Sequence, residues 1–290
     1  MPSYRQVKRR IRSVQNTAKI TNALQLVAAS KMRRAQQRAA AAKPYAERMR
    51  AVLGNLAAQV GTAGPGDEAI HPLLERRLGN RVTVLVVSPM RGLSGGLPGN
   101  VNRRVLQTIR EQGEAPVQII AVGKKGRDFA VRAGFRVIAE YLDLGDYPSA
   151  ADITPIARQV IDEYLSHRAD RVLMVFPDFI NTVTQRPTVR QLLPVQPPEE
   201  AQPAGPQIDY IYEPSAREVL AELLPRYIEM QIYEAVLQNV ASQYSAQMVA
   251  MRNATDNATE LLGDLTLTYN KARQAAITTQ ILEIVAGSSA

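Results

Sequence analysis

Residues 3–43 read SYRQVKRRIRSVQNTAKITNALQLVAASKMRRAQQRAAAAK, a stretch that contains neither glycine nor proline. Both residue types weaken the interior of a helix, so their absence over this length predicts one long helix. Apolar or small side chains recur in alternating steps of three and four, which is the spacing of a coiled-coil seam. Gln25 interrupts the series. The predicted seam positions are Tyr4, Val7, Ile11, Val14, Ala18, Thr21, Ala28, Met32, Ala35, Ala39 and Ala42.

The other end of the chain has the same spacing. Between Arg226 and Leu262 there is again no glycine or proline, and the alternation of three and four continues past Gly263. A helix over residues 226–286 would be roughly 90 Å long, which is too long for one face of a compact domain. Two such helices at opposite chain ends can bury their seams by pairing antiparallel. The second seam is Leu237, Ala241, Tyr244, Met248, Met251, Thr255, Ala258, Leu262, Leu265, Tyr269, Ala272 and Ala276.

The middle of the chain alternates between short β-branched runs and helical stretches, a pattern typical of a mainly parallel, doubly wound sheet. Ser149 and Asp152 form the capping pattern that begins a helix. Residues 194–206 hold five prolines and predict an exposed loop. The predicted strands are Arg81–Ser88, Val117–Val122, Arg136–Tyr141 and Arg171–Phe176, and the predicted helices are residues 102–112, 124–133 and 149–168.

The expected fold class is therefore α/β, with an inserted domain between two long helices. We expect a coiled-coil helix over residues 1–60, the inserted doubly wound domain over 75–200 and the second coiled-coil helix over 209–290. No apolar run reaches the ~18 residues of a membrane span, and the first residues lack the apolar region of a secretory signal.

Positive charge is concentrated at the N-terminal end. The first 50 residues hold 13 Lys and Arg against one acid, Glu47, a net charge of +12, so the remaining residues carry −4 of the total of +8. Such asymmetry indicates an anionic partner, namely a nucleic acid, a lipid surface or an acidic protein. The alternative is an ordinary solvated helix face. A basic coiled-coil protein that binds nucleic acid would explain the charge but not the inserted α/β domain.

Residues 91–100, RGLSGGLPGN, follow a predicted strand, where a dinucleotide fold would bind phosphate. Their glycines do not form G-x-G-x-x-G, and the chain has no P-loop motif. The segment GKKG at 123–126 is too short for that motif. A nucleotide-dependent enzyme built on the middle domain would therefore lack a phosphate loop.

Side chains for catalysis or metal binding are also scarce. There is no cysteine, and the two histidines, His71 and His167, are expected at the surface. No catalytic triad or metal cluster can be assembled, so we expect no catalytic, cofactor-binding or metal-binding residue. The acids of the middle domain are expected at solvated positions; they include Asp143, Asp146, Asp162 and Glu163.

Long terminal motifs carry a family resemblance. SVQNTAKITNALQLVAASKMRRAQ (residues 13–36), MVAMRNATDNA (248–258) and YNKARQAAITTQILEIVAGSSA (269–290) resemble the ends of ATP synthase γ subunits. RGLSGG (91–96), FINTVTQRPTVRQLLP (179–194) and DYIYEP (209–214) follow in the family's order. The resemblance covers nearly the whole chain, and departures such as Met90, Ser94, Pro98–Gly99 and Gln280 affect individual contacts.

This resemblance implies an antiparallel coiled coil with an inserted Rossmann-like domain, acting as the central rotor of an F-type ATP synthase. It implies one copy per complex, inside a hexamer of α and β subunits, with its foot on the ε subunit and the c-ring. Rotation would couple proton flow to ATP synthesis or hydrolysis on the β subunits, and the chain itself would be non-catalytic. Without cysteine or a transit peptide, a bacterial enzyme is expected, peripheral on the cytoplasmic face of the plasma membrane.

The resemblance also implies which residues contact the β subunits. Leu24 matches a position that passes the acidic lever of β, which would be the partner of the basic N-terminal helix instead of nucleic acid. A second group matches the loop near the same lever, and a third matches positions that meet the catch loop of β. The second group is Arg91, Gly92 and Leu93, and the third is Arg252, Arg273, Gln274 and Thr278.

Overall fold

The computed structural model describes residues 4–60, 71–196 and 212–288. Two long helices, α1 (Tyr4–Val60) and α5 (Ala216–Ser288), enclose an α/β segment in the chain order. The chain divides into two compact units. We call Met1–Ser30 with Gln247–Ala290 the two-helix unit, and Lys31–Ala246 the α/β unit.

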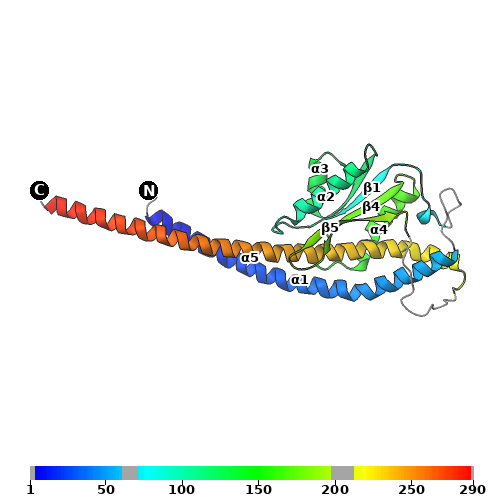
Figure 1. Ribbon diagram of the computed structural model, residues 1–290, viewed down its shortest axis with the longest axis horizontal. Coiled ribbons are helices and arrows are strands. Elements are labelled where there is room, and N and C mark those ends of the chain that lie inside the picture. The colour runs from blue at the N-terminus through cyan, green and yellow to red at the C-terminus, as the bar shows by residue number, and fades with distance from the viewer. Residues whose placement is uncertain (1–3, 61–70, 197–211, 289–290) are drawn as a thin grey trace. The chain divides into compact units, whose positions relative to one another are not determined.

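In the two-helix unit, α1 and α5 lie side by side and run in opposite directions (Figure 1). The Tyr4 and Tyr269 rings lie 6.4 Å apart, and the hydroxyls of Thr21 and Thr255 are 2.7 Å apart. Each predicted seam position in this unit is buried or half-buried, whereas flanking residues such as Lys19 are exposed. The sequence prediction of the two seams is therefore confirmed.

Both long helices include a proline that lies outside the glycine- and proline-free stretches from which the helices are predicted. Pro44 is exposed within α1, which continues to Val60, and Pro225 lies within α5. A proline inside a helix removes one backbone hydrogen bond. Apolar side chains that follow Pro44 are buried in the core of the α/β unit, and their packing explains why the helix does not end there. These side chains are Ala46, Met49, Leu53 and Leu56.

The α/β unit contains one five-stranded sheet in the order β3-β2-β1-β4-β5. The first four strands in this order are parallel, and β5 pairs antiparallel with β4. This confirms the doubly wound prediction but adds β5, which the sequence analysis missed. The strands are β1 (Val82–Val87), β2 (Val117–Val122), β3 (Arg136–Tyr141), β4 (Arg171–Phe179) and β5 (Gln185–Leu193).

Helices cover both faces of the sheet (Figure 1). One core joins α2 (Leu97–Glu111) and α3 (Lys124–Arg132) to alternate residues of the strands. The other core joins α4 (Ala150–Leu165), the one-turn helix η1 (Pro72–Leu74) and the portions of α1 and α5 in this unit. Because both faces are buried, all six residues of β1 are buried, as expected for a central parallel strand.

Two expectations about the acids of the middle domain are wrong. Glu163 is on the buried side of α4, 3.0 Å from Arg168, and Asp146 is only 24% exposed in an ion pair with Lys31. A buried acid is retained where a cation or hydrogen-bond donor compensates for lost hydration, and spacing alone does not reveal that partner. Asp143 and Asp162 are exposed, as predicted. The predicted exposed loop at 194–206 is wrong at its start, where Pro194 and Val195 are buried and the Val195 amide donates to the Leu73 carbonyl at 2.9 Å. From position 197 onward, the predicted loop lies outside the described residues.

Candidate functional site

The carboxyl edge of the sheet, where doubly wound folds bind ligands, is occupied by α5. The side-chain amide of Asn239 donates to the Ser88 carbonyl after β1, at 3.1 Å. The backbone amide of Met90 donates to the side-chain oxygen of Gln243, at 3.0 Å. Ser242 donates to the Pro177 carbonyl within β4. A cavity of about 30 Å³ is left beside Met90 and Gln243, compared with about 300–1,000 Å³ in typical ligand pockets.

The GKKG segment at 123–126 uses its glycines for packing. A Cβ on Gly123 or Gly126 would lie within 3 Å of Ser88 atoms, so only glycine allows α3 to begin against the end of β1. The first amides of α3 are already bonded, because Gly126 donates to the Ser88 hydroxyl at 2.7 Å and Lys125 donates to the Pro89 carbonyl at 3.1 Å. These amides are therefore not free to bind a phosphate.

The Gly-rich turn forms an exposed loop before α2. Arg91 has a side chain 69% exposed and lies 3.8 Å from Asp146, and Leu93 is 60% exposed with a positive φ of 65°. Gly92 is half-buried between them. The three residues assigned from the family resemblance thus lie together on one accessible loop of the α/β unit.

Asp146 is the centre of a charged cluster that joins two helices, α1 and α5, and the Gly-rich turn at Arg91 to the loop after β3. The Lys31 ammonium on α1 lies 2.6 Å from its carboxylate and 5.3 Å from the Tyr244 ring of α5. Burial alone would raise the pKa of Asp146, but Lys31, the Tyr244 hydroxyl and the charge of Arg91 together lower that pKa below its usual value. Burial and the adjacent Asp146 raise the pKa of Tyr244, so both groups keep their neutral-pH state. Sequence reasoning missed this cluster because its members are far apart in the chain.

The other five predicted contact residues lie in the two-helix unit. Leu24 is half-buried and Arg252 is exposed, each about one turn from the Thr21–Thr255 contact. Arg273 follows Arg252 by three seven-residue repeats, so the two arginines occupy the same position relative to the seam. The last three residues, Arg273, Gln274 and Thr278, are exposed, and the Thr278 hydroxyl donates to the Gln274 carbonyl at 3.0 Å.

The end of α5 exposes apolar side chains. Within the two-helix unit, α5 continues past the start of α1, beyond the Tyr4–Tyr269 contact, so no α1 residue lies opposite this segment (Figure 1). The sequence analysis missed this surface, whose signal is the series of apolar residues that follows the last predicted seam position, Ala276. Contiguous exposed apolar surface of this kind marks an interaction site. Its members are Ile277, Ile281, Leu282, Ile284 and Val285.

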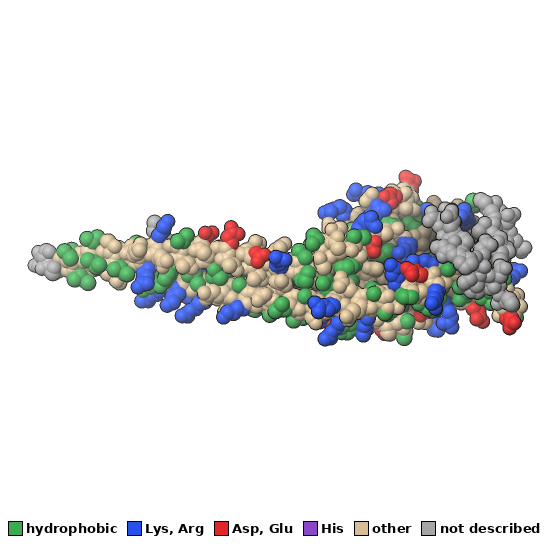
Figure 2. All heavy atoms as spheres, turned by 60° about the horizontal axis from the view of Figure 1, so that its bottom comes forward, with side chains coloured by type: hydrophobic (Ala, Val, Ile, Leu, Met, Phe, Trp, Pro, Cys, Tyr) green, Lys and Arg blue, Asp and Glu red, His purple; other side chains and the backbone are tan. Residues whose placement is uncertain are grey.

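Figure 2 shows Lys and Arg side chains spaced along the two-helix unit, close to its hydrophobic end. Among the residues that the structure describes, no group of three His, Cys, Asp or Glu side chains could hold a metal ion. Within the same residues, no helix combines the length and apolar character needed to cross a membrane.

Comparison with known proteins places these features in a family. A family model for ATP synthase matches residues 3–290. The chain is 50% identical over 293 residues to the ATP synthase gamma chain of Roseiflexus castenholzii, covering 100% of this chain and 99% of the relative. The corresponding chain of Chloroflexus aurantiacus is 49% identical over 294 residues, with the same coverage.

Solved structures agree on the fold at low sequence identity. A chain of the Euglena gracilis mitochondrial ATP synthase (OSCP/F1/c-ring) matches with a TM-score of 0.63 at 18% identity, covering 99% of this chain and 93% of that one. A chain from the central stalk and c-ring of the Tetrahymena thermophila enzyme matches with a TM-score of 0.59 at 19% identity, over 81% of this chain and 99% of that one. The family model and the full-length relatives show that this chain belongs to the ATP synthase γ-chain family.

Proposed function

We propose that this chain is the central rotor of an F-type ATP synthase, turning inside a hexamer of α and β subunits. The observation that carries the proposal is the end of α5, where a helix continues alone and exposes Ile281, Leu282 and Ile284. A single helix with an apolar surface needs an enclosing partner to remove that surface from water. Membership of the ATP synthase γ-chain family supports a hexamer of α and β subunits as that partner.

The two-helix unit can couple rotation to catalysis because its faces differ. A cationic α1 lies along one side, and α5 presents a different set of polar residues on the other. Each β subunit would meet a different face and bind nucleotide with a different affinity, so rotation shifts the populations of the catalytic sites. The chain contributes no reacting group in this scheme, which accords with the closed carboxyl edge of its sheet.

The residues proposed to contact β fall into two groups. Leu24 and the exposed loop at Arg91, Gly92 and Leu93 would pass the acidic lever of β. The β catch loop would meet four residues of α5, namely Arg252, Arg273, Gln274 and Thr278. All except Leu24 and Gly92 have exposed side chains in the isolated chain.

The remaining partners follow from the same assignment. The α/β unit would carry the ε subunit and the c-ring, and one copy of the chain would serve each complex. Proton flow through the ring would then turn ring and rotor together. The complex would lie on the cytoplasmic face of a bacterial plasma membrane, with this chain attached peripherally.

A rotation assay tests the proposal directly. The chain has no cysteine, so Gln107→Cys on the exposed side of α2 provides a unique attachment point for a bead. In a surface-fixed complex with α and β, we expect ATP-dependent rotation of the bead in one direction. The unsubstituted chain, which cannot be labelled, is the control. Complexes that hydrolyse ATP at the usual rate while the bead stays still would overturn the rotor assignment.

A further inference from the structure

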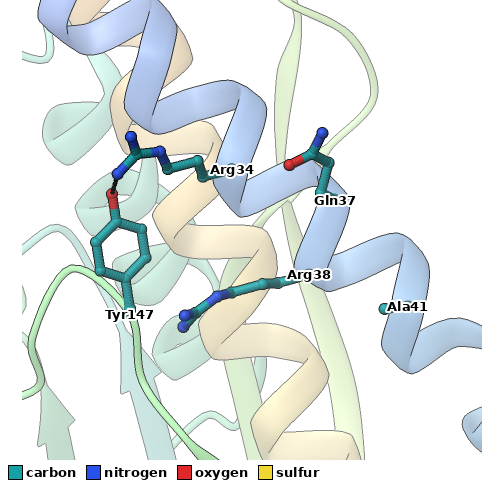
Figure 3. Close-up of a pocket in the computed structure, with 5 residues that line it drawn as sticks. All are labelled: Arg34, Gln37, Arg38, Ala41 and Tyr147. Atoms are coloured by element: carbon teal, nitrogen blue, oxygen red, sulfur yellow. Dashed lines mark hydrogen bonds between the residues drawn. The ribbon is translucent and has the colours of Figure 1, made fainter.

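A hollow of about 360 Å³ lies on the surface of the α/β unit, between α1 and the loop that precedes α4. Figure 3 shows Arg34 and Arg38 directed from successive turns of α1 toward Tyr147. This volume is within the range of about 300–1,000 Å³ that holds small molecules. The lining residues are Arg34, Gln37, Arg38, Ala41 and Tyr147.

The tyrosine holds both arginines in place. Arg34 donates to the Tyr147 hydroxyl at 3.4 Å, and the Arg38 guanidinium lies 4.7 Å from the centre of the Tyr147 ring. A cation over an aromatic face is attracted to it, so the ring positions one guanidinium while its hydroxyl positions the other. The hydroxyl accepts from Arg34, and its own proton remains available for donation to a bound group.

Neither guanidinium has a counter-ion among the described residues. The neighbouring carboxylate, Asp146, already pairs with Lys31 at 2.6 Å and with Arg91 at 3.8 Å. Lys31, Arg34 and Arg38 lie along one side of α1, and only the first has a described acidic partner. Two guanidinia that contact one tyrosine and have no described acidic partner, at the wall of a hollow, form a site for an anion.

The donor geometry favours a phosphate oxyanion. Arginine presents several N–H donors in a rigid fork that matches the oxygens of phosphate, and pairs of such bonds are stronger than neutral hydrogen bonds. We propose that Arg34, Arg38 and Tyr147 bind phosphate, either as the free ion or as part of a nucleotide. The proposal is independent of the rotor role, because the isolated chain contains the complete site.

Calorimetric titration of the full chain tests this site. Sodium phosphate and ATP are titrated separately, without divalent cations, in chloride buffers of equal ionic strength. We expect saturable phosphate binding that is at least about tenfold weaker in the double variant Arg34→Gln, Arg38→Gln, since two charge-assisted contacts are lost. Markedly tighter binding of ATP would identify a nucleotide as the source of the phosphate, and similar binding would identify the free ion.

Matched variants separate a built site from general positive charge. The control double variant Arg33→Gln, Arg48→Gln removes two exposed arginines from the same helix outside the hollow, and it should bind phosphate as the unsubstituted chain does. Arg34→Lys with Arg38→Lys keeps the charge without the fork and should bind more weakly. Thermal unfolding in chloride checks that each variant is folded. The proposal is overturned if phosphate and chloride behave alike, if both double Gln variants lose binding equally, or if a polyglutamate peptide binds while phosphate does not.

Discussion

Asp146 shows how one residue can join distant segments of this chain. Its carboxylate accepts a hydrogen bond from the Lys31 ammonium of α1 and lies beside the buried Tyr244 of α5. Its other carboxylate oxygen lies 3.8 Å from Arg91. The α/β unit begins at Lys31 on α1 and ends at Ala246 on α5, so each boundary lies within three residues of a member of this cluster. The cluster therefore anchors both helices where they enter this unit.

Removing the Asp146 charge should destabilise the α/β unit. We expect Asp146→Asn to lower its free energy of unfolding by about 1–2 kcal/mol, between the values for exposed and fully buried ion pairs. The neighbouring Asp143 is exposed in the same loop, so Asp143→Asn is the matched control and should change stability little. Urea unfolding of the three proteins at neutral pH measures the difference. Equal effects of the two substitutions would contradict the anchoring role.

The same cluster predicts a pH dependence. The folded state lowers the pKa of Asp146, so its contribution to stability is complete above the pKa of the unfolded chain, about 3.9. That contribution is lost as the pH falls through the lower folded-state pKa. Melting temperatures of the unsubstituted chain and Asp146→Asn should therefore converge as the pH falls below about 4. A difference that stays constant down to pH 2 would assign the effect to packing instead of charge.

Adding a single methyl group at Gly126 should also destabilise the α/β unit. A Cβ at this position would lie 2.6 Å from the Ser88 hydroxyl and 2.9 Å from a methyl of Val86, both in the buried layer under α3. We expect Gly126→Ala to cost about 1–3 kcal/mol of stability through overpacking. In Gly99→Ala the new methyl meets no atom within 4 Å, and it should be neutral or stabilise α2 by up to about 1 kcal/mol. Chemical denaturation of both variants gives the comparison.

At the scale of the elements, local patterns in the sequence predict most of the fold. The strands β2 and β3 begin and end where their β-branched runs do, and the Ser149–Asp152 capping box begins α4 as expected. Local pattern fails where tertiary packing decides the outcome. Strand β5 contains Pro187 and charged residues, which its pairing with β4 at the sheet edge tolerates.

The sequence also predicts some features of the candidate site and not others. The seam pattern predicts the helix pair, and the family resemblance supplies the proposed β contacts. Neither of them predicts the Asp146 cluster or the paired arginines at Tyr147, because these depend on contacts between residues more than 100 positions apart. Side-chain clusters formed by such distant residues can be identified only from the folded structure, in which the sheet and the long helices bring those residues together.

The two units should differ in local stability in the isolated chain. The helix pair buries mostly small side chains, such as Ala28 and Ala258, whereas the α/β core buries Tyr164 and Phe176. Less buried apolar surface gives a lower free energy of local opening. Hydrogen exchange should therefore be at least about a hundredfold faster in residues 247–288 than in β1 and β4, and should slow on assembly with α and β. Equal protection of both units in the free chain would contradict this expectation.

At the scale of the whole molecule, function depends on contacts that change as the rotor turns. Leu24 is half-buried on the basic helix, and its proposed neighbour is the acidic lever of β. We expect Leu24→Lys to add an ion pair that raises the energy needed for rotation under load. ATP-driven proton pumping should then fall more than ATPase turnover. Leu26→Lys, at a position already 64% exposed, is the control, and equal loss of both activities would indicate defective assembly.

The end of α5 permits the most direct test of the proposed catch-loop contacts. Arg273 and Gln274 are exposed beside the seam position Ala272, so their side chains contribute little to the helix pair itself. As ordinary surface residues, each would change stability by no more than about 0.5 kcal/mol on substitution by alanine. If they bind the catch loop at particular rotor angles, each charge-assisted hydrogen bond is worth roughly 1.5–3 kcal/mol and alters the barriers between those angles. The double variant Arg273→Ala, Gln274→Ala should then change multisite ATPase turnover several-fold while assembly with α and β stays intact.

A matched double variant separates this effect from a general loss of surface polarity. Gln107→Ala with Arg110→Ala removes the same two side-chain types from the exposed side of α2, and it should leave ATPase turnover unchanged. Deleting residues 287–290 should also have little effect, because no seam position lies that far along α5. Turnover is measured on purified complexes with equal subunit content, so that a change reports on rotation and not on assembly. Wild-type turnover in the Arg273, Gln274 double variant would show that these side chains form only a solvated helix face, and the proposed catch-loop contact would then have to involve other residues of α5.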